Sequence, residues 1–166
     1  MNRKIFTIKG IALGIAIIAL TALMLTISGS RSEASAHDDI DRINALLDEF
    51  EDTYSNKRVN DVRQLFYANS VIAIDLDGGQ NQRVVGLEDW LQATEQTIFK
   101  LNENISDRLT NREIVVLRNI AYVVCNYTYI DDTHKAQGMD VFTLLKTRDR
   151  WRIVSLQWTG DTVETY

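Results

Sequence analysis

The chain has 166 residues, 45% of them hydrophobic, which is typical of one globular domain that buries a core. Its 18 basic and 23 acidic side chains give a formal net charge of −5, and no segment after residue 36 gathers Lys and Arg into a cluster. Phosphate backbones and anionic membrane surfaces repel such a chain, so the composition argues against nucleic-acid binding and against membrane-surface binding.

The first 36 residues have the layout of an export signal. A basic start is followed by the nearly charge-free run 11–27 and then by a small, polar segment. Ala34 and Ala36 have the small-x-small spacing that signal peptidase requires, and Ala34 also ends an alternative Ser-Glu-Ala cut. We therefore predict a signal peptide over residues 1–36 and a mature domain over residues 37–166.

The apolar run 11–27 leaves one alternative open. It is longer than a typical signal core of about 7–15 residues and slightly shorter than the roughly 20 residues that span a bilayer. An uncleaved N-terminal membrane anchor is therefore the alternative to a cleaved signal. In both cases the basic flank stays inside and the rest crosses the membrane, so we expect an exported domain, periplasmic or extracellular.

The predicted cut and export determine two properties of the mature domain. Removing residues 1–36 takes away four of the 18 basic and one of the 23 acidic side chains, which leaves a net charge of −8. The single cysteine, Cys125, has no second cysteine with which to form an intramolecular disulfide in an oxidising compartment. The core must therefore hold the fold, and Cys125, within an apolar run, is interpreted as a buried, inert thiol.

Apolar residues at three- and four-residue spacings predict three helices. The first follows the predicted cut and ends near Asn56, with acidic residues in its first turn. The second is short, begins after Asn60 or Asp61 as N-cap and stops near Asn69. The third covers residues 87–99 and follows a brief strand.

The rest of the chain is rich in β-branched and aromatic residues. A short strand over residues 71–75 precedes the third helix, and four β-rich runs separated by turn-like segments follow it: 112–119, 120–131, 135–147 and 149–161. The simplest arrangement of these four is a consecutive antiparallel meander. A curved, mostly antiparallel sheet covered by three helices forms an α+β, cone-like cup, which can hold a small-molecule pocket.

Two aspartates, Asp75 and Asp77, follow the first strand, and three roles compete for them. A calcium loop starting at Asp75 would need an oxygen ligand at its fifth position and a glutamate at its twelfth, where the sequence has glycines, so no metal site is predicted. Asp77 and Gly78 are typical of a turn. Asp75 shares one strand face with Val71 and Ala73, so it is a general base if that face lines the cup and a turn cap otherwise.

A third aspartate, Asp140, interrupts an apolar run. Period-two alternation places it with Phe142 and Leu144 on one face of the strand. A carboxyl group on such a face is either at an edge with access to water or a buried, protonated functional acid. The sequence contains no Gly-rich phosphate loop, zinc-ligand spacing or nucleophile motif, so we expect no cofactor and no metal.

The order of these elements resembles that of the ketosteroid isomerase-like superfamily, also called SnoaL-like or nuclear transport factor 2-like. The segments that carry the resemblance are LFYANSVIAID, VVGLEDWLQ and MDVFTLLKTRDRWRIVSLQW, and it covers essentially the whole mature chain. It implies a cone-shaped cup and sheet-to-sheet homodimers. It also implies a functional range from isomerases and dehydratases to non-catalytic interaction modules.

The resemblance implies roles for individual residues. Asp75 aligns with the general-base aspartate of the isomerases, and Asp140 aligns with the acid beside their oxyanion. Their oxyanion tyrosine in the first helix is replaced by Glu51, and Tyr54 lies one turn further along. The implied lining of the pocket is aromatic and comprises Phe50, Tyr54, Trp90, Phe142 and Trp158.

Two functions are compatible with this pattern. The first is an exported, non-catalytic module of the superfamily that binds a small apolar molecule or dimerises, and the missing tyrosine favours it. The alternative is an isomerase-like or dehydratase-like enzyme that uses Asp75 as base and Asp140 as acid on a small apolar carbonyl or hydroxy compound. The sequence leaves the choice between binding and catalysis open.

Export is tested by fractionating cells that express the full chain. We expect a shortened product outside the cytoplasm that begins near His37, identified by N-terminal sequencing or intact mass. A full-length product in the membrane fraction would instead favour the anchor. A full-length soluble product in the cytoplasm would contradict export.

Overall fold

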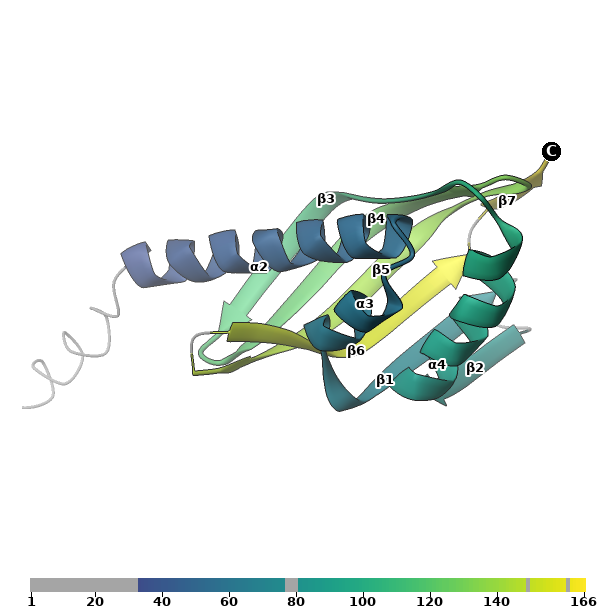
Figure 1. Cartoon of the computed structure of the whole chain (residues 1–166). Coiled ribbons are helices and arrows are strands. Elements are labelled where there is room, and N and C mark those ends of the chain that lie inside the picture. Colours follow the sequence, from purple (N-terminus) through teal and green to yellow (C-terminus); the bar gives the residue numbers. More distant parts are fainter. Residues whose placement is uncertain (1–32, 77–80, 149, 161) are drawn as a thin grey trace, which may run out of the picture. The chain divides into compact units, whose positions relative to one another are not determined.

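Three helices accompany the strands in the structure, a computed structural model that describes residues 33–166 except 77–80, 149 and 161 (Figure 1). They are α2 (Glu33–Ser55), α3 (Val59–Leu65) and α4 (Leu87–Thr94), the last continued by the π-helical turn η1 (Glu95–Phe99). Within the described residues, no helix is both long enough and apolar enough to cross a membrane. The predicted turn at Asp77 and Gly78 and the apolar run 11–27 lie outside the described residues.

The strands form one seven-stranded sheet, which confirms the predicted α+β class. Their order is β2-β1-β6-β5-β4-β3, with β7 paired to β5. Strands β3 to β6 form the predicted antiparallel meander, whereas β1 pairs with β6 in parallel. The strands are β1 (Phe66–Leu76), β2 (Asn81–Gly86), β3 (Ile105–Leu117), β4 (Ile120–Asp131), β5 (His134–Thr147), β6 (Arg150–Gly160) and β7 (Thr162–Thr165).

The second helix ends earlier than its apolar spacing predicts. Helix α3 stops at Leu65, and Phe66 takes an extended backbone, with φ −101° and ψ 162°, that opens β1. Phe66 pairs with Ile153 of β6, and the Ser70 hydroxyl donates to the Ile153 carbonyl oxygen at 2.8 Å. Pairing with β6 therefore outweighs the helical period of residues 66–69.

The third helix carries an irregularity that its sequence pattern does not show. Four buried residues of α4 keep the predicted helical spacing: Leu87, Trp90, Leu91 and Thr94. The π-helical turn η1 then adds a residue to the turn, so that Phe99 is buried while Ile98 also packs against the core. Both side chains reach the interior, where a regular helix would bring Ile98 alone.

The sheet buries one face and exposes the other. Residues of β4 alternate along its first two thirds, with Ala121, Val123, Cys125 and Tyr127 buried and the residues between them exposed. Figure 1 shows α2, α3 and α4 on the same side of the sheet, and the buried face meets them there. Cys125 is buried, as predicted for a thiol inside an apolar strand.

Strand β5 is shared between two partners. Its first residues, His134 to Gln137, pair with β7, whereas β6 pairs with β5 from Asp140 onward. Gly138 lies between the two segments, and a Cβ atom there would stand 1.9 Å from the Thr159 carbonyl oxygen. Glycine is therefore the residue that lets the end of β6 pass this close to β5.

Candidate functional site

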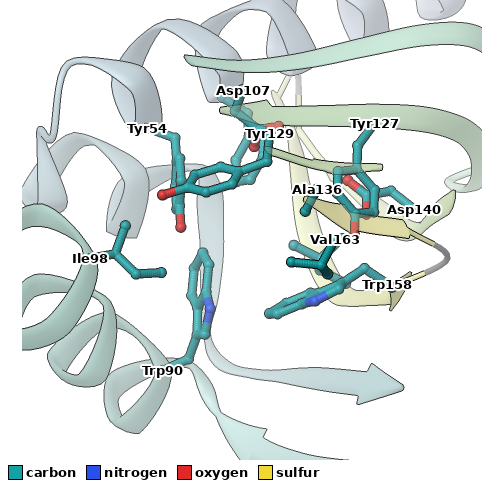
Figure 2. A pocket seen from close by; sticks show the side chains of 13 residues that line it. Tyr54, Trp90, Ile98, Asp107, Tyr127, Tyr129, Ala136, Asp140, Trp158 and Val163 are labelled. Atoms are coloured by element: carbon teal, nitrogen blue, oxygen red, sulfur yellow. The ribbon is translucent and has the colours of Figure 1, made fainter. Parts of the chain in front are cut away.

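A cavity of about 180 Å³ lies between the helices and the buried face of the sheet (Figure 2). Its thirteen lining residues come from α2, α4, η1 and the strands β3 to β7. The wall is apolar apart from tyrosine hydroxyls, the indole N–H groups and two carboxyl groups, those of Asp107 and Asp140. Six of the lining residues are aromatic: Phe50, Tyr54, Trp90, Tyr127, Tyr129 and Trp158.

Contacts between aromatic rings hold this wall together. Tyr54 stacks on Trp90 with ring centroids 6.1 Å apart and an interplanar angle of 13°. Trp90 meets Trp158 at 6.2 Å, and Tyr54 meets Phe99 edge-on at 5.1 Å. Each such pair contributes about 0.5–1.5 kcal/mol beyond the burial of its surface. The rings thus fix α2, α4 and β6 around the cavity.

Asp107 of β3 and Asp140 of β5 stand in this wall with 8% and 5% of their surface exposed. Burial raises the pKa of Asp107 to about 7, the charge of Glu51 adds to the rise, and a hydrogen bond from the Arg108 backbone opposes it. Burial, followed by the charge of Asp107, raises the pKa of Asp140 well above its ordinary value. Burial therefore favours the protonated form of Asp140, and near neutral pH Asp107 is divided between its two forms.

One oxygen of Asp107 lacks a donor. Its Oδ1 atom is buried and has no hydrogen-bond partner among the described residues. The nearby Tyr129 hydroxyl donates to Asp131 instead, at 2.8 Å. A buried acceptor without a donor costs about 1–3 kcal/mol, and in a cavity wall it marks a place for a ligand group.

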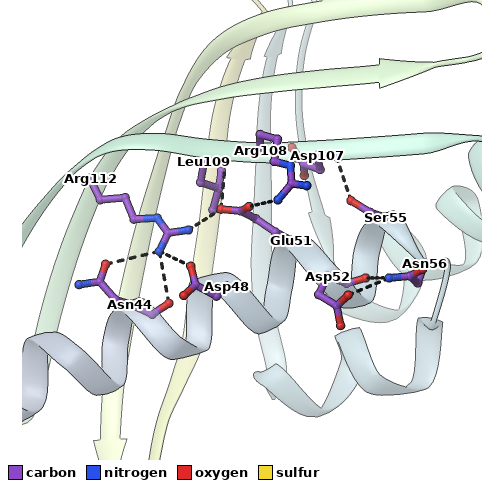
Figure 3. Close-up of polar contacts among 10 residues, drawn as sticks. All are labelled: Asn44, Asp48, Glu51, Asp52, Ser55, Asn56, Asp107, Arg108, Leu109 and Arg112. Carbon is purple, nitrogen blue, oxygen red and sulfur yellow. Dashed lines mark hydrogen bonds and ion pairs between the residues drawn. The ribbon is translucent and has the colours of Figure 1, made fainter.

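Helix α2 holds Asp107 in place through the backbone of β3 (Figure 3). The Asp107 amide donates to the Ser55 hydroxyl at 2.9 Å, and the Leu109 amide donates to Oε1 of Glu51 at 3.1 Å. Strand β3 is the last in the sheet order, so no strand of the described chain pairs with it on this side. Two side chains one helical turn apart therefore supply the acceptors that a further strand would have offered.

Glu51 is buried and forms a salt bridge with an arginine. Its carboxylate binds Arg112, which also donates to Asp48 at 2.7 Å and to the Asn44 carbonyl oxygen at 3.3 Å. The resemblance aligns Glu51 with an oxyanion tyrosine, but Glu51 binds β3 and is not among the residues that line the cavity. The tyrosine of α2 that does line it is Tyr54, one turn further along.

Asp75 does not line the cavity, which corrects its expected place there. The predicted alternation is right, but Ile72, fully buried, belongs to the core face, whereas Val71 on the other face is 43% exposed. Asp75 instead borders a separate depression that also contacts Arg83 and Met139. Because a strand turns successive side chains to opposite faces, the burial of Ile72 directs Asp75 outward.

The other predicted pocket residues divide into two groups. Asp140 lines the cavity together with four of the five predicted aromatic residues: Phe50, Tyr54, Trp90 and Trp158. Phe142 is the exception, because it is fully buried in the core, where its ring meets Phe50 at 5.7 Å. In the described part of the chain, no three His, Cys, Asp or Glu side chains come together in a way that could hold a metal ion.

Sequence reasoning missed Asp107, Tyr127 and Tyr129. A usable signal exists for Asp107, which stands two residues before the buried Leu109 and so shares its strand face. The same pattern, a carboxyl beside an apolar residue at period two, drew attention to Asp140. Tyr127 and Tyr129 pair with Leu109 and Asp107 across β3 and β4, a register that the sequence does not specify.

The sequence matches the model of the SnoaL-like domain over residues 43–158, a span that contains both pocket aspartates. The chain belongs to the SnoaL-like family. This confirms the superfamily inferred from the sequence, which also includes nuclear transport factor 2-like proteins. Among curated proteins, none matches the sequence.

Solved structures share the fold of this SnoaL-like domain at low sequence identity. The Kfla4162 protein of Kribbella flavida is 19% identical with a TM-score of 0.67, covering 78% of this chain and 95% of that one. A candidate scytalone dehydratase of Novosphingobium aromaticivorans is 13% identical with a TM-score of 0.70, covering 80% and 91%. A hexachlorocyclohexane dehydrochlorinase is 8% identical with a TM-score of 0.67, covering 81% and 93%. These likenesses establish the fold alone.

Replacing Asp107 with asparagine should remove part of a pH-dependent loss of stability. The pKa of Asp107 is about 7 in the folded domain and about 3.9 in an unfolded chain. Between these values the folded state keeps a proton that the unfolded chain has lost, so stability falls as the pH rises from about 4 to about 7. Urea titrations at both ends of this range should show a smaller fall for Asp107→Asn, by on the order of a few kcal/mol.

Asp132→Asn is the control with the opposite sign. Asp132 is exposed, and hydrogen bonds from Asn104 and from the Glu103 amide lower its pKa. The ionised Asp132 side chain stabilises the fold at pH values above its pKa in the unfolded chain, and this stabilisation disappears as the pH falls through its lower pKa in the folded domain. Asp132→Asn should therefore be less stable than the parent protein at neutral pH and equally stable in acid. An unchanged pH dependence in Asp107→Asn would contradict the electrostatic role assigned to Asp107.

Proposed function

We propose that the domain binds a small, mostly apolar molecule in the aromatic cavity. The observation that carries this proposal is the burial of two carboxyl groups, Asp107 and Asp140, in the cavity wall. Desolvated carboxyl groups lower stability at neutral pH, so a fold under selection for stability alone would replace them with apolar side chains. A ligand whose polar group reaches their oxygens offsets this cost.

We also propose that the domain acts outside the cytoplasm. The support is the sequence of residues 1–36, in which a basic start, an apolar run and a small-x-small site follow one another. The pocket would then meet molecules of the periplasm or of the medium. The formal charge of −8 on residues 37–166 suits a soluble exported domain, because like-charged molecules repel one another and stay dispersed.

A second candidate function is proton transfer, and one observation favours it. A carboxyl with a pKa of about 7 in a cavity is poised to act as a general base at neutral pH, and Asp107 has this value. In this mechanism Asp107 takes a proton from the carbon next to a carbonyl group while protonated Asp140 donates to the carbonyl oxygen. In a β,γ-unsaturated ketone, Asp107 then returns the proton to the γ-carbon while the enol returns its proton to Asp140, which gives isomerisation. In a β-hydroxy ketone, the hydroxyl takes the proton from Asp107 and leaves as water while the enol returns its proton to Asp140, which gives dehydration. Asp107 takes the place first assigned to Asp75.

Filling the cavity tests the binding function. Ala136 lines the cavity, so Ala136→Phe should abolish binding of small single-ring ketones, alcohols and amines, measured by ligand-observed NMR and by tryptophan fluorescence. Ala73→Phe is the matched control, because Ala73 borders the outer depression. Equal binding by the parent protein and Ala136→Phe would contradict the proposal.

Proton transfer is tested with the same ketones in D₂O, where NMR spectra should show deuterium entering at the carbon next to the carbonyl group. Asp107→Asn should prevent this exchange.

The outer face of the sheet supports the expected homodimer as a further proposal. This face carries exposed large apolar side chains on β3, β4 and β5, namely Val115, Leu117, Ile120, Tyr122, Val124 and Met139, each between 36% and 56% exposed. Apolar side chains gathered on one face of a sheet are a common mark of a protein interface. A second copy of the chain would cover them sheet to sheet.

Sedimentation of the purified protein at micromolar concentration should report twice the monomer mass. Val124→Lys places a charge on the outer face of β4 and should shift the protein to monomer, because a buried unpaired charge is costly. Leu101→Lys is the control, since Leu101 is 74% exposed and lies outside the strands. A soluble monomer in the parent protein would reject the dimer.

A further inference from the structure

We propose that the cavity selects an organic cation, an amine carried on a small apolar body. This rests on the binding function proposed above and adds to it the charge of the ligand. Three observations on the cavity wall converge on it: the sign of its ionisable groups, an acceptor without a donor, and the aromatic faces.

Every ionisable side chain in the wall is an acid or a phenol. The thirteen lining residues include Asp107 and Asp140 but no Lys, Arg or His. Behind Asp107, the charge of Glu51 is matched by Arg112, so this arginine is engaged outside the cavity. A carboxylate that forms in this wall therefore finds no counter-charge there, and a cationic ligand would provide one.

The wall contains an acceptor that none of its donors reaches. Oδ1 of Asp107 is buried without a hydrogen-bond partner among the described residues, and the nearby Tyr129 hydroxyl donates to Asp131 instead. An ammonium group brings up to three N–H donors and a positive charge to such a site. A hydrogen bond from an ammonium to a carboxylate is roughly twice as strong as one between neutral groups.

The rings around the acids present faces that attract cations. Trp90 and Trp158 meet at 58° with ring centroids 6.2 Å apart, Tyr54 stacks on Trp90, and all three rings line the cavity (Figure 2). A cation over the face of an indole or phenol gains about 0.5–2 kcal/mol, the upper value when it is desolvated. Aromatic faces beside carboxylates in one small cavity therefore favour a cation over a neutral molecule of the same shape.

A neutral carbonyl compound satisfies the wall less well. It can accept from protonated Asp140, but it brings no donor to Oδ1 of Asp107 and no counter-charge. An anionic ligand would be repelled by the ionised form of Asp107. Among ligands that fit an apolar cavity of this size, a protonated amine is the class that pairs with each of the polar features described.

Binding of a cation should release protons, because it stabilises the ionised form of Asp107. The titratable groups that interact with Asp107 are Glu51 and Tyr54 on α2, Cys125 and Tyr129 on β4 and Asp140 on β5, and the backbone of Arg108 on its own strand donates a hydrogen bond to it. Asp107 has a pKa of about 7 without a cation, so part of the population carries a proton to be released at neutral pH. A neutral ligand has no such effect.

The test compares benzylamine, which is protonated at neutral pH, with benzyl alcohol, which has the same ring and a neutral polar group. Isothermal titration calorimetry of the purified protein should give at least about tenfold tighter binding of benzylamine, the combined effect of one cation–π contact and one charge-assisted hydrogen bond. Titrations in two buffers of different ionisation enthalpy should show proton release with benzylamine and none with benzyl alcohol.

Asp107→Asn should reduce the affinity for benzylamine to that for benzyl alcohol and leave the alcohol unaffected. Asp132→Asn, which changes an exposed aspartate outside the cavity, should leave both affinities unchanged. A thermal melt confirms that each variant is folded. If Asp107→Asn does not fold, Trp158→Leu carries the test, since it keeps an apolar wall but removes an aromatic face, and the preference for benzylamine should fall several-fold.

The outcomes separate this inference from the function on which it rests. Equal affinity for the two ligands, or a preference for the amine that survives in Asp107→Asn, overturns the cation inference and leaves the binding function standing. Binding of neither ligand, and of no member of the panel used to test the cavity, overturns both. Selective, proton-releasing binding of benzylamine that Asp107→Asn abolishes supports both.

Discussion

Two backbone amides of β3 donate to side chains of α2, and the cavity depends on these contacts. Glu51 and Ser55 receive the amides of Leu109 and Asp107 along an edge that no described strand covers. On the same helix, Phe50 and Tyr54 have the same four-residue spacing, one position earlier, and both line the cavity. One stripe of α2 therefore seals the edge of the sheet while the adjacent stripe forms the wall of the site.

This arrangement explains how the domain keeps two carboxyl groups in an apolar wall. Asp107 is kept facing the cavity because Ser55 binds its backbone amide and Glu51 binds the amide of Leu109, two residues further along the strand. Asp140 is fixed by its position in the middle of the sheet, between its neighbours Cys125 and Trp158 on β4 and β6. The interlocked rings around them supply the packing that offsets the cost of burying these acids.

The sequence predicts this fold well and its site in part, for a physical reason. Period-two patterns tell which residues share a face, and they placed Asp140 beside an apolar neighbour correctly. They do not tell which face turns inward, and for Asp75 this was decided by the burial of Ile72 and by parallel pairing with β6, a contact between distant segments. The early end of α3 at Leu65 has the same origin.

Two further features of the site lie beyond any local pattern. The π-helical turn carries Phe99 inward beside Ile98, and the ring of Phe99 packs against Tyr54, a residue of α2 that is distant in sequence. Asp107 acquires its raised pKa from burial and then from the charge of Glu51, which is distant in sequence and meets it only in the folded domain. A pattern search can nominate such a residue, but its electrostatic environment follows from tertiary structure.

The division of β5 between β6 and β7 has a kinetic consequence. Strand β7 is four residues long and pairs with β5 along one edge, and its Val163 lines the cavity although it is 59% exposed. A short strand that is paired along one edge only opens locally far more often than the domain unfolds. Exchange of molecules between the cavity and the solvent should therefore follow the rate at which β7 separates from β5.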